Sequence, residues 1–355
     1  MSFRTVNPIQ TFVVYLTGPK ESGGAIGKPP GRSRRIEILL IFRERNTFMT
    51  KVFIDGSAGT TGLRIRERLS GRRDLTLITL PEEVRKDPSA RRDALNSADI
   101  AFLCLPDAAA VEAVSLVSSR DTVIIDTSTA HRTADGWTYG FPELTGLREK
   151  IASSKRIANP GCHASGFIAL VAPLMEAGLL KPGVRLSAFS LTGYSGGGKK
   201  MIAEYESGDR SPLYAAPRQY GLSQAHKHLP EMVKVCGLEY APVFCPIVAP
   251  YYAGMEVTVP LTPADTSAVP EQIREVYRSY YASGLISFRE SADESGFLSA
   301  GAMAGRDDME ITVCGNEERI LLISRFDNLG KGASGAAIQN MNLALGLDEA
   351  TGLER

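Results

Sequence analysis

The segment from Lys51 to Leu69 constrains the fold more than any other part of the chain. It reads as a short apolar strand over residues 51–55, a glycine-rich turn over residues 56–62 and an amphipathic helix over residues 63–69. Three further apolar, strand-like runs follow: Leu75–Leu80, Ala98–Leu105 and Thr122–Asp126. An Ala- and Val-rich stretch over residues 108–117, between the last two runs, reads as a helix. Short strands that are apolar throughout and alternate with helices are typical of a parallel sheet covered on both faces. The sequence therefore predicts an α/β fold with a doubly wound parallel sheet.

After Asn159 the pattern of the sequence changes. Residues 161–177 read as a helix, and the runs that follow are longer and strand-like, with few helices between them. These runs are Val184–Leu191, Ala241–Val248, Met255–Leu261 and Glu310–Ile323. They predict a mixed or antiparallel sheet in a second domain, and the Ala-rich residues 332–345 predict a terminal helix.

Length and charge narrow the class of protein. The chain has 355 residues, enough for two domains, and its 40 Lys and Arg residues balance 40 Asp and Glu residues. A chain without net charge has no global field for nucleic acid, and no apolar run approaches the roughly 20 residues that span a bilayer. We therefore expect a small-molecule partner and neither nucleic acid nor membrane.

Cysteine usage and the start of the chain give two further expectations. The five Cys residues are spread without a CxxC pair and their number is odd, so we expect no disulfide framework, no metal and a reducing, cytoplasmic compartment. Residues 1–48 contain Gly-Gly, Pro-Pro and an arginine cluster before Met49. We interpret them as a disordered extension or the product of an upstream start codon rather than a targeting peptide.

The glycine turn is suited to a dinucleotide. Glycines let the backbone approach a pyrophosphate while the start of the helix donates N–H groups to it. The spacing is GxxGxxG rather than GxGxxG, and a tight turn without a ligand would look similar. After the second strand, Glu82 would suit NAD and Arg85 would suit the extra phosphate of NADP, so the residues alone leave the cofactor open.

Cys162 is the candidate nucleophile. It lies between a strand-like run and a helix, so we expect it at a helix N-terminus, where the helix dipole favours the thiolate. The other four Cys residues lie in apolar runs or beside Gly and Pro, which suits packing. The cluster from His226 through His228 to Glu231 supplies two imidazoles and a carboxylate for proton exchange. Its spacing leaves open which imidazole faces the thiol.

Two more loops combine glycines with cations. Residues 192–200 contain Ser195 and three consecutive glycines before two lysines, and residues 326–335 contain Asn328 and Lys331 among glycines. Backbone N–H groups in such loops can hold an anion, although a surface linker or an ordinary strand–helix turn would read the same way.

Together these motifs resemble those of N-acetyl-γ-glutamyl-phosphate reductase, in particular its shorter variant. The resemblance runs from Met49 to about Leu347 and rests on the order and joint presence of the motifs. They are the GxxGxxG turn, Tyr139–Glu143, Asn159–Cys162, Gly193–Gly196, His226–Glu231, and Asp327–Gly332 with Gln339–Asn342.

The resemblance implies an NADPH-dependent oxidoreductase of arginine biosynthesis. Cys162 would attack an acyl phosphate and form a thioester, which hydride transfer would convert to N-acetylglutamate semialdehyde. His228 would be the general acid–base, with His226 as the alternative. The substrate site would comprise Arg132, Tyr220 and Glu231, with Arg132 holding phosphate. The cofactor site would comprise Gly56, Ser57, Gly59, Thr60, Thr61, Gly62, Arg85, Ser195, Gly196 and Asn328.

The same resemblance implies a Rossmann-type doubly wound parallel sheet with an inserted α+β domain. Residues 49–158 with 325–355 would form the dinucleotide-binding domain, and residues 159–324 the catalytic domain of a homo-oligomer, either a dimer or a tetramer. The nearest alternative is aspartate-semialdehyde dehydrogenase or another acyl-phosphate reductase of that superfamily. A nucleotide-binding regulatory protein is the alternative from another class, and it would have no need of an activated cysteine.

Overall fold

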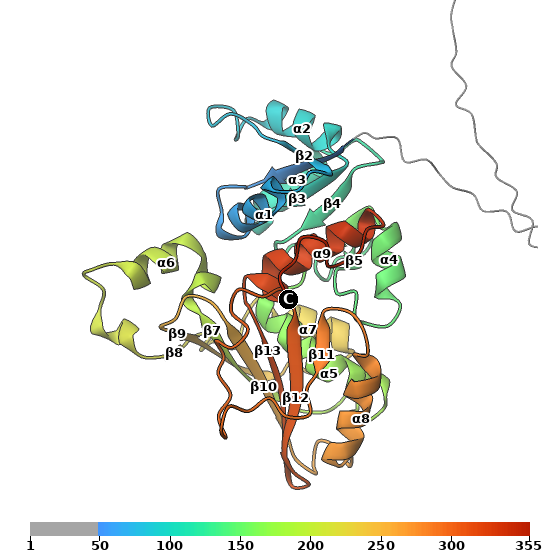
Figure 1. Cartoon of the computed structure of the whole chain (residues 1–355), viewed down its shortest axis with the longest axis vertical. Coiled ribbons are helices and arrows are strands. Elements are labelled where there is room, and N and C mark those ends of the chain that lie inside the picture. The colour runs from blue at the N-terminus through green and yellow to red at the C-terminus, as the bar shows by residue number, and fades with distance from the viewer. Residues whose placement is uncertain (1–48) are drawn as a thin grey trace, which may run out of the picture. The chain divides into compact units, whose positions relative to one another are not determined.

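The glycine-rich turn joins the first strand to the first helix, as predicted, in the computed structural model, which describes residues 49–355 (Figure 1). The extension expected over residues 1–48 lies outside the described residues. Gly56 has a φ of +85°, and a side chain there would collide with the Cys104 carbonyl group. A side chain at Gly62 would lie 2.5 Å from the Gly56 carbonyl oxygen. Both positions therefore need glycine for the chain to turn this tightly.

The first sheet contains six parallel strands in the order β2-β1-β3-β4-β6-β5. The strands are β1 (Thr50–Asp55), β2 (Leu75–Ile78), β3 (Ile100–Leu103), β4 (Val123–Asp126), β5 (Thr138–Tyr139) and β6 (Arg156–Ala158). The helices around it are α1 (Thr60–Ser70), α2 (Pro88–Ser97), α3 (Asp107–Ser115), α4 (Leu147–Ser153) and α9 (Gly335–Ala344). Helices α1, α4 and α9 share one apolar cluster with the sheet, and α2 and α3 share another. Helices thus cover both faces, which confirms the predicted doubly wound parallel sheet.

The last helix completes the core of this first sheet. Helix α9 contributes Ala337, Ile338 and Met341 to the apolar cluster that contains Val52 and Ile54 of β1 (Figure 1). The helix starts later than the sequence indicated. Residues Gly330–Ser334 form a single π-helical turn, so the α-helix begins at Gly335 rather than Gly332.

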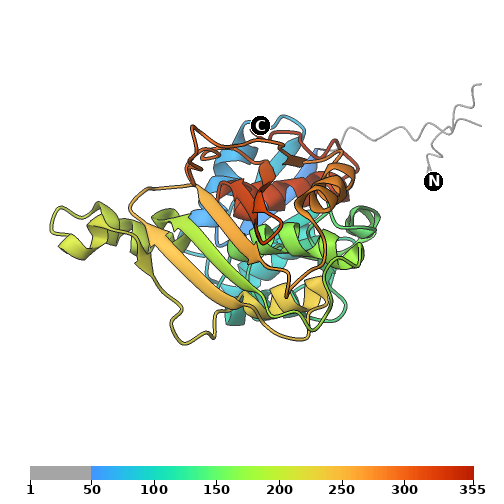
Figure 2. The same ribbon diagram turned by 90° about the horizontal axis from the view of Figure 1, so that it is seen from below.

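The second sheet is mixed and contains seven strands in the order β11-β12-β13-β10-β7-β9-β8. In Figure 2, strands of this sheet lie side by side in green, yellow and orange. The strands are β7 (Ser187–Gly193), β8 (Arg218–Gln219), β9 (Val243–Ala249), β10 (Met255–Leu261), β11 (Ile286–Phe288), β12 (Met309–Asn316) and β13 (Arg319–Phe326). Its helices are α5 (Cys162–Glu176), α6 (Gly198–Glu206), α7 (Leu229–Cys236) and α8 (Pro270–Tyr280), with short 3-10 turns at Tyr194–Gly197 and Pro212–Ala215. The single strand expected over residues 310–323 is wrong, because β12 and β13 form an antiparallel hairpin there.

Helix α5 is the central helix of the second domain, and all of its residues from His163 to Leu174 are buried. It contains Pro173, which lacks the N–H group that would bond to the Ala169 carbonyl oxygen one turn earlier. The Tyr281 hydroxyl donates to that oxygen at 2.8 Å, so the broken helical bond is replaced. The rigid packing of α5 fixes the position of its first residue, Cys162.

Within residues 49–355, none of the helices combines the length and apolar character that would be needed to cross a bilayer.

Candidate active site

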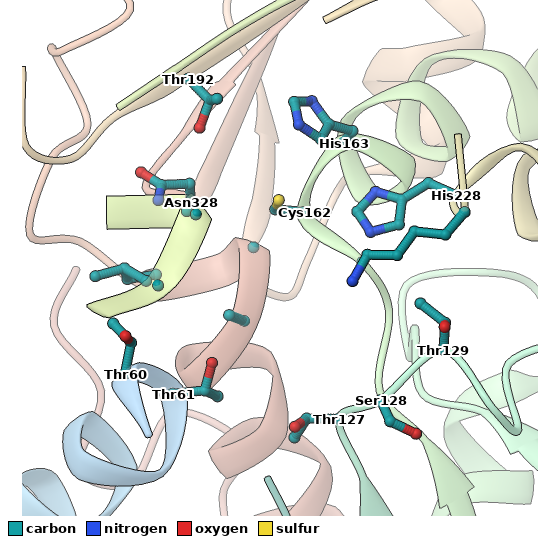
Figure 3. Close-up of a pocket in the computed structure, with 18 of the residues that line it drawn as sticks. Thr60, Thr61, Thr127, Ser128, Thr129, Cys162, His163, Thr192, His228 and Asn328 are labelled. Atoms are coloured by element: carbon teal, nitrogen blue, oxygen red, sulfur yellow. The ribbon is translucent and has the colours of Figure 1, made fainter. Parts of the chain in front are cut away.

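A cavity of about 500 Å³ lies where the carboxyl ends of β3, β4 and β6 meet the second domain. Six segments line it, and Figure 3 shows labelled side chains from five of them around one space. The segments are Gly59–Thr61, Cys104–Asp107, Thr127–Arg132, Asn159–His163, Thr192–Gly198 and His226–His228, joined by Tyr220, Asn328 and a few neighbours. The cavity therefore brings the glycine turn, the cysteine and the paired imidazoles together, as the mechanism expected from the sequence requires.

Cys162 is the first residue of α5 and is half-buried in the wall of this cavity. Burial raises the pKa of its thiol above 9.0, although the Arg132 charge and the His163 backbone N–H act in the opposite direction. The expectation that the helix terminus makes the free thiol acidic is therefore wrong. Removal of the thiol from water outweighs the helix dipole, so the nucleophile needs a neighbouring base.

His228 is the imidazole that lies beside the cysteine. A side chain on Gly161, the residue before Cys162, would sit 2.5 Å from His228 Nε2. His228 Nδ1 is buried and has no hydrogen-bond partner among the described residues. Burial lowers the pKa of His228 well below 6.5, so the ring is neutral at pH 7.

His226 lines the same cavity but is engaged differently. Its Nδ1 accepts a hydrogen bond from the His228 backbone N–H at 3.2 Å, and the two rings pack edge to face with centroids 4.8 Å apart. Burial also lowers the pKa of His226. His226 therefore orients the loop that presents His228.

Arg132 and Glu231 form a buried ion pair, with 2.7 Å between Arg132 Nη1 and Glu231 Oε1. Glu231 also accepts hydrogen bonds from the Tyr139 hydroxyl at 2.8 Å and from the Gly161 N–H at 3.2 Å. Arg132 donates through its other two nitrogens to the Asn159 and Thr127 carbonyl oxygens. All three guanidinium nitrogens are thus engaged. Glu231 holds the backbone next to Cys162 and does not itself line the cavity.

Tyr220, which was expected at the substrate site, lines the cavity and is held by a residue that the sequence analysis missed. Its hydroxyl is joined to His163 Nε2 at 2.6 Å, and His163 Nδ1 is joined to Ser190 Oγ at 2.7 Å. Burial lowers the pKa of His163 to about 3, so this imidazole acts as a neutral link. Its position directly after the nucleophile was the available signal.

The predicted cofactor residues divide between two cavities and the backbone of the turn. Gly59, Thr60, Thr61, Ser195, Gly196 and Asn328 line the cavity that contains Cys162. Asn328 Nδ2 donates to Ser195 Oγ at 2.9 Å, and its Oδ1 accepts from the Gly254 N–H at 3.0 Å, which fixes the amide. Thr60 Oγ1 is buried without a partner among the described residues, at the start of a helix whose first N–H groups lack a side-chain cap. An anion placed there would satisfy these donors.

A second cavity of about 520 Å³ adjoins the other side of the turn and is lined by Gly56, Ser57 and Arg85. Four further cationic side chains line it: Arg66, Lys86, Arg91 and Lys199. Arg85 Nε lies 2.5 Å from Glu82 Oε1, and Arg91 is paired with Asp55. Gly62 lines neither cavity and serves the turn itself.

Residues 49–355 contain no group of three His, Cys, Asp or Glu side chains arranged to hold a metal ion.

The fold and the site define a two-domain oxidoreductase of the semialdehyde dehydrogenase class. Residues 38–154 match the family described as "Semialdehyde dehydrogenase, NAD binding domain", and residues 162–328 match "Semialdehyde dehydrogenase, dimerisation domain". The fold is similar to that of aspartate semialdehyde dehydrogenase II from Vibrio cholerae in complex with ASA, with a TM-score of 0.64, 19% identity and coverage of 84% of this chain and 98% of that one. The enzyme from Candida albicans with NADP gives a TM-score of 0.61 at 15% identity, over 83% of this chain and 98% of that one.

Sequence relatives narrow the class to one family. The chain is 44% identical to "N-acetyl-gamma-glutamyl-phosphate reductase 2" of Nostoc sp., over 85% of this chain and 99% of the relative. It is 47% identical to the N-acetyl-gamma-glutamyl-phosphate reductase of Burkholderia lata, over 83% of this chain and 96% of the relative. The chain belongs to the N-acetyl-gamma-glutamyl-phosphate reductase family.

Proposed function

We propose that the protein reduces N-acetyl-γ-glutamyl phosphate to N-acetyl-L-glutamate 5-semialdehyde and phosphate with NADPH, as a step of arginine biosynthesis. The observation that carries this proposal is the position of Cys162. Its thiol lies at the start of a rigid helix, in one cavity with a neutral imidazole and with the anion-binding turn of the first domain. The names of the relatives supply the substrate.

The residues around the glycine turn fit a nicotinamide dinucleotide. The unpartnered Thr60 Oγ1 and the uncapped start of α1 would hold the pyrophosphate, and Ser195 and Asn328 would border the end that extends toward Cys162. A reduced nicotinamide, when bound, supplies the hydride that reduction of a thioester requires.

Cys162 and His228 account for the remaining chemistry. The imidazole takes the thiol proton as sulfur attacks the acyl carbon, so the buried thiol is ionised only when substrate is in place. The carbon–oxygen bond to phosphate breaks, and the proton on His228 leaves with the phosphate. After hydride addition, the tetrahedral oxyanion collapses to the aldehyde and expels the Cys162 thiolate, which regains a proton from solvent through the same imidazole.

The other predicted substrate residues act around this pair. Glu231 holds Arg132 and the Gly161 N–H, so we propose that both fix the entrance to α5. Tyr220, aligned by His163, would present its hydroxyl to the substrate. Because the charge of Arg132 is paired with Glu231, we propose that a further cation takes part in phosphate recognition.

The second cavity favours NADP over NAD. Arg66, Lys86 and Lys199 line it without an ion-pair partner among residues 49–355, so a 2′-phosphate would meet uncompensated positive charge. The predicted Arg85 lies in the same wall beside Glu82. Cations at this position suit the phosphorylated dinucleotide.

We also propose that the protein is a homo-oligomer, either a dimer or a tetramer, assembled through the outer face of the second sheet. The match to a dimerisation domain supports assembly, and strands β7, β9 and β13 expose the large apolar side chains Phe189, Val243 and Leu321. Burial of such a patch against a second copy would remove it from water.

The assay runs in reverse, with N-acetylglutamate 5-semialdehyde, phosphate and NADP, and follows reduced cofactor. Cys162→Ser should abolish the reaction, whereas Cys314→Ser, a cysteine of β12 outside the cavity, should leave it intact. His228→Asn should lower the rate by about 100-fold, the usual scale for a general acid–base. A protein that prefers aspartate semialdehyde, or that keeps full activity without Cys162, would contradict the proposal.

A further inference from the structure

Lys227 lies between the two histidines of the catalytic loop and lines the cavity that contains Cys162. Its side chain is exposed, and its ammonium group has no hydrogen-bond or ion-pair partner among residues 49–355. The ammonium is close enough to Cys162 for its charge to oppose the rise in the pKa of the thiol caused by burial. The ammonium is therefore available to an anion that enters the cavity.

The other polar groups on this side of the cavity are already engaged. Arg132 is neutralised by Glu231, and its three nitrogens all donate to protein oxygens. In the loop after β4, the N–H and hydroxyl of Ser128 donate to Asp126, and those of Thr129 donate to Asp107. Of the two Lys and Arg side chains that line this cavity within the described residues, Lys227 is therefore the one whose charge is not already paired with a carboxylate.

Asp107 is the carboxylate that faces Lys227 across the cavity. Burial acts to raise the pKa of Asp107, but the Thr129 hydrogen bonds and, to a smaller extent, the charges of Lys227 and Arg132 lower it; Lys227 and Asp107 nevertheless form no ion pair. Both carboxylate oxygens of Asp107 accept from Thr129 at 2.9 and 2.5 Å. Asp107 thus anchors the loop and leaves the Lys227 ammonium unsatisfied.

We infer that Lys227 binds the phosphoryl group of the acyl phosphate, and the inorganic phosphate that takes its place in the reverse reaction. This inference rests on the proposed function. The substrate carries two anionic groups, a phosphoryl group on the carbon that sulfur attacks and a carboxylate at the far end of the chain. Because Lys227 and Cys162 line the same cavity, we place at the ammonium the phosphoryl group, which adjoins the attacked carbon, rather than the far carboxylate. The ammonium would also stabilise the charge that grows on phosphate as the carbon–oxygen bond breaks.

The test compares the wild-type protein with Lys227→Met, Lys227→Arg and Lys234→Met in the reverse reaction. Lys234 is a matched control, because it is an exposed lysine of the adjacent helix α7 that lines no part of the cavity. The KM for phosphate and the KM for the semialdehyde are measured separately. The pH dependence of Cys162 alkylation is followed in the same variants, since it reports the position of the charge without turnover.

Lys227→Met should raise the KM for phosphate about 10- to 100-fold, the range of a charge-assisted hydrogen bond, and leave the KM for the semialdehyde within about threefold. It should also raise the pKa of the Cys162 thiol. Lys227→Arg should recover most of the phosphate affinity, and Lys234→Met should match the wild type. An unchanged KM for phosphate, or a rise in the KM for the semialdehyde instead, would overturn the inference. Absence of any phosphate-dependent reaction in the wild type would overturn the proposed function itself.

Discussion

Replacement of Glu231 with Gln tests whether the buried ion pair sets the acidity of the catalytic thiol. The Glu231 carboxylate raises the pKa of Cys162, and the Arg132 guanidinium lowers it, although burial has the larger effect. Gln keeps the shape of the side chain and removes its negative charge while Arg132 remains. The pKa of the Cys162 thiol should therefore fall, and alkylation at a fixed pH near neutrality should become faster.

The same substitution should destabilise the protein. The side chains of Arg132 and Glu231 are only 8% and 1% exposed, so Gln leaves a buried cation without its partner. Loss of one member of a buried pair costs about 3–5 kcal/mol, a large part of the roughly 5–15 kcal/mol that stabilises a typical domain. We expect the Tm to fall by roughly 6–15 °C. A lower thiol pKa together with a lower Tm in Glu231→Gln would show that the Arg132–Glu231 pair affects the acidity of Cys162. An ion pair that contributes to stability alone would lower only the Tm.

The assay follows iodoacetamide modification of the Cys162 peptide by mass spectrometry across a pH range, together with thermal unfolding. Arg132→Gln should shift the thiol pKa in the opposite direction and also lower the Tm. Glu271→Gln, which removes two exposed ion pairs of α8, should change neither quantity measurably. The reasoning is refuted if the thiol pKa of Glu231→Gln rises, or if it stays unchanged in both Glu231 and Arg132 variants.

Two further predictions concern pH and the cofactor. Burial holds the pKa of His163 at about 3, below its usual 6.5, so the unfolded chain binds a proton that the folded protein does not once the pH falls below 6.5. The free energy of unfolding should therefore decrease with falling pH. Urea unfolding should show that His163→Gln reduces the slope of this free energy against pH by up to about 1.4 kcal/mol per pH unit between roughly pH 6 and 4. An unchanged slope would mean that His163 is not kept neutral in the folded protein. Arg66→Ala and Arg85→Ala should each raise the KM for NADP several-fold and leave the KM for NAD nearly unchanged, whereas a parallel rise in both would place these side chains away from the 2′-phosphate.

The elements that could be predicted are those whose signal is local. The strand–glycine turn–helix unit follows from Gly56 and Gly62, and the bounds of β10 follow from the alternation between Met255 and Leu261. The hairpin of β12 and β13 was missed although two signals were available: the four polar residues from Asn316 to Arg319 separate its apolar runs, and Gly315 has a φ of +100°. Helix α8 was also missed, because only a narrow stripe of it is buried.

The candidate active site also has a part that could be predicted from local sequence signals and a part that could not. Cys162 and the histidine loop could be located from short motifs, but their electrostatics depend on contacts between distant segments. Arg132 and Glu231 are 99 residues apart in the sequence, and His163 and Tyr220 are 57 apart. The helix dipole at Cys162 can be read from the sequence, whereas the burial that overrides it exists only once both domains have packed.

The return of α9 to the first sheet has a consequence for synthesis on the ribosome. All strands of the second sheet have been made once Phe326 has left the ribosome, whereas the core around Val52 and Ile54 waits for residues 335–344. The domain that begins the chain is therefore the last to be finished. A nascent chain that stalls after Phe326 would contain a complete second sheet and a first sheet with one apolar face exposed to water. Such a chain would be bound by chaperones or degraded by quality-control proteases.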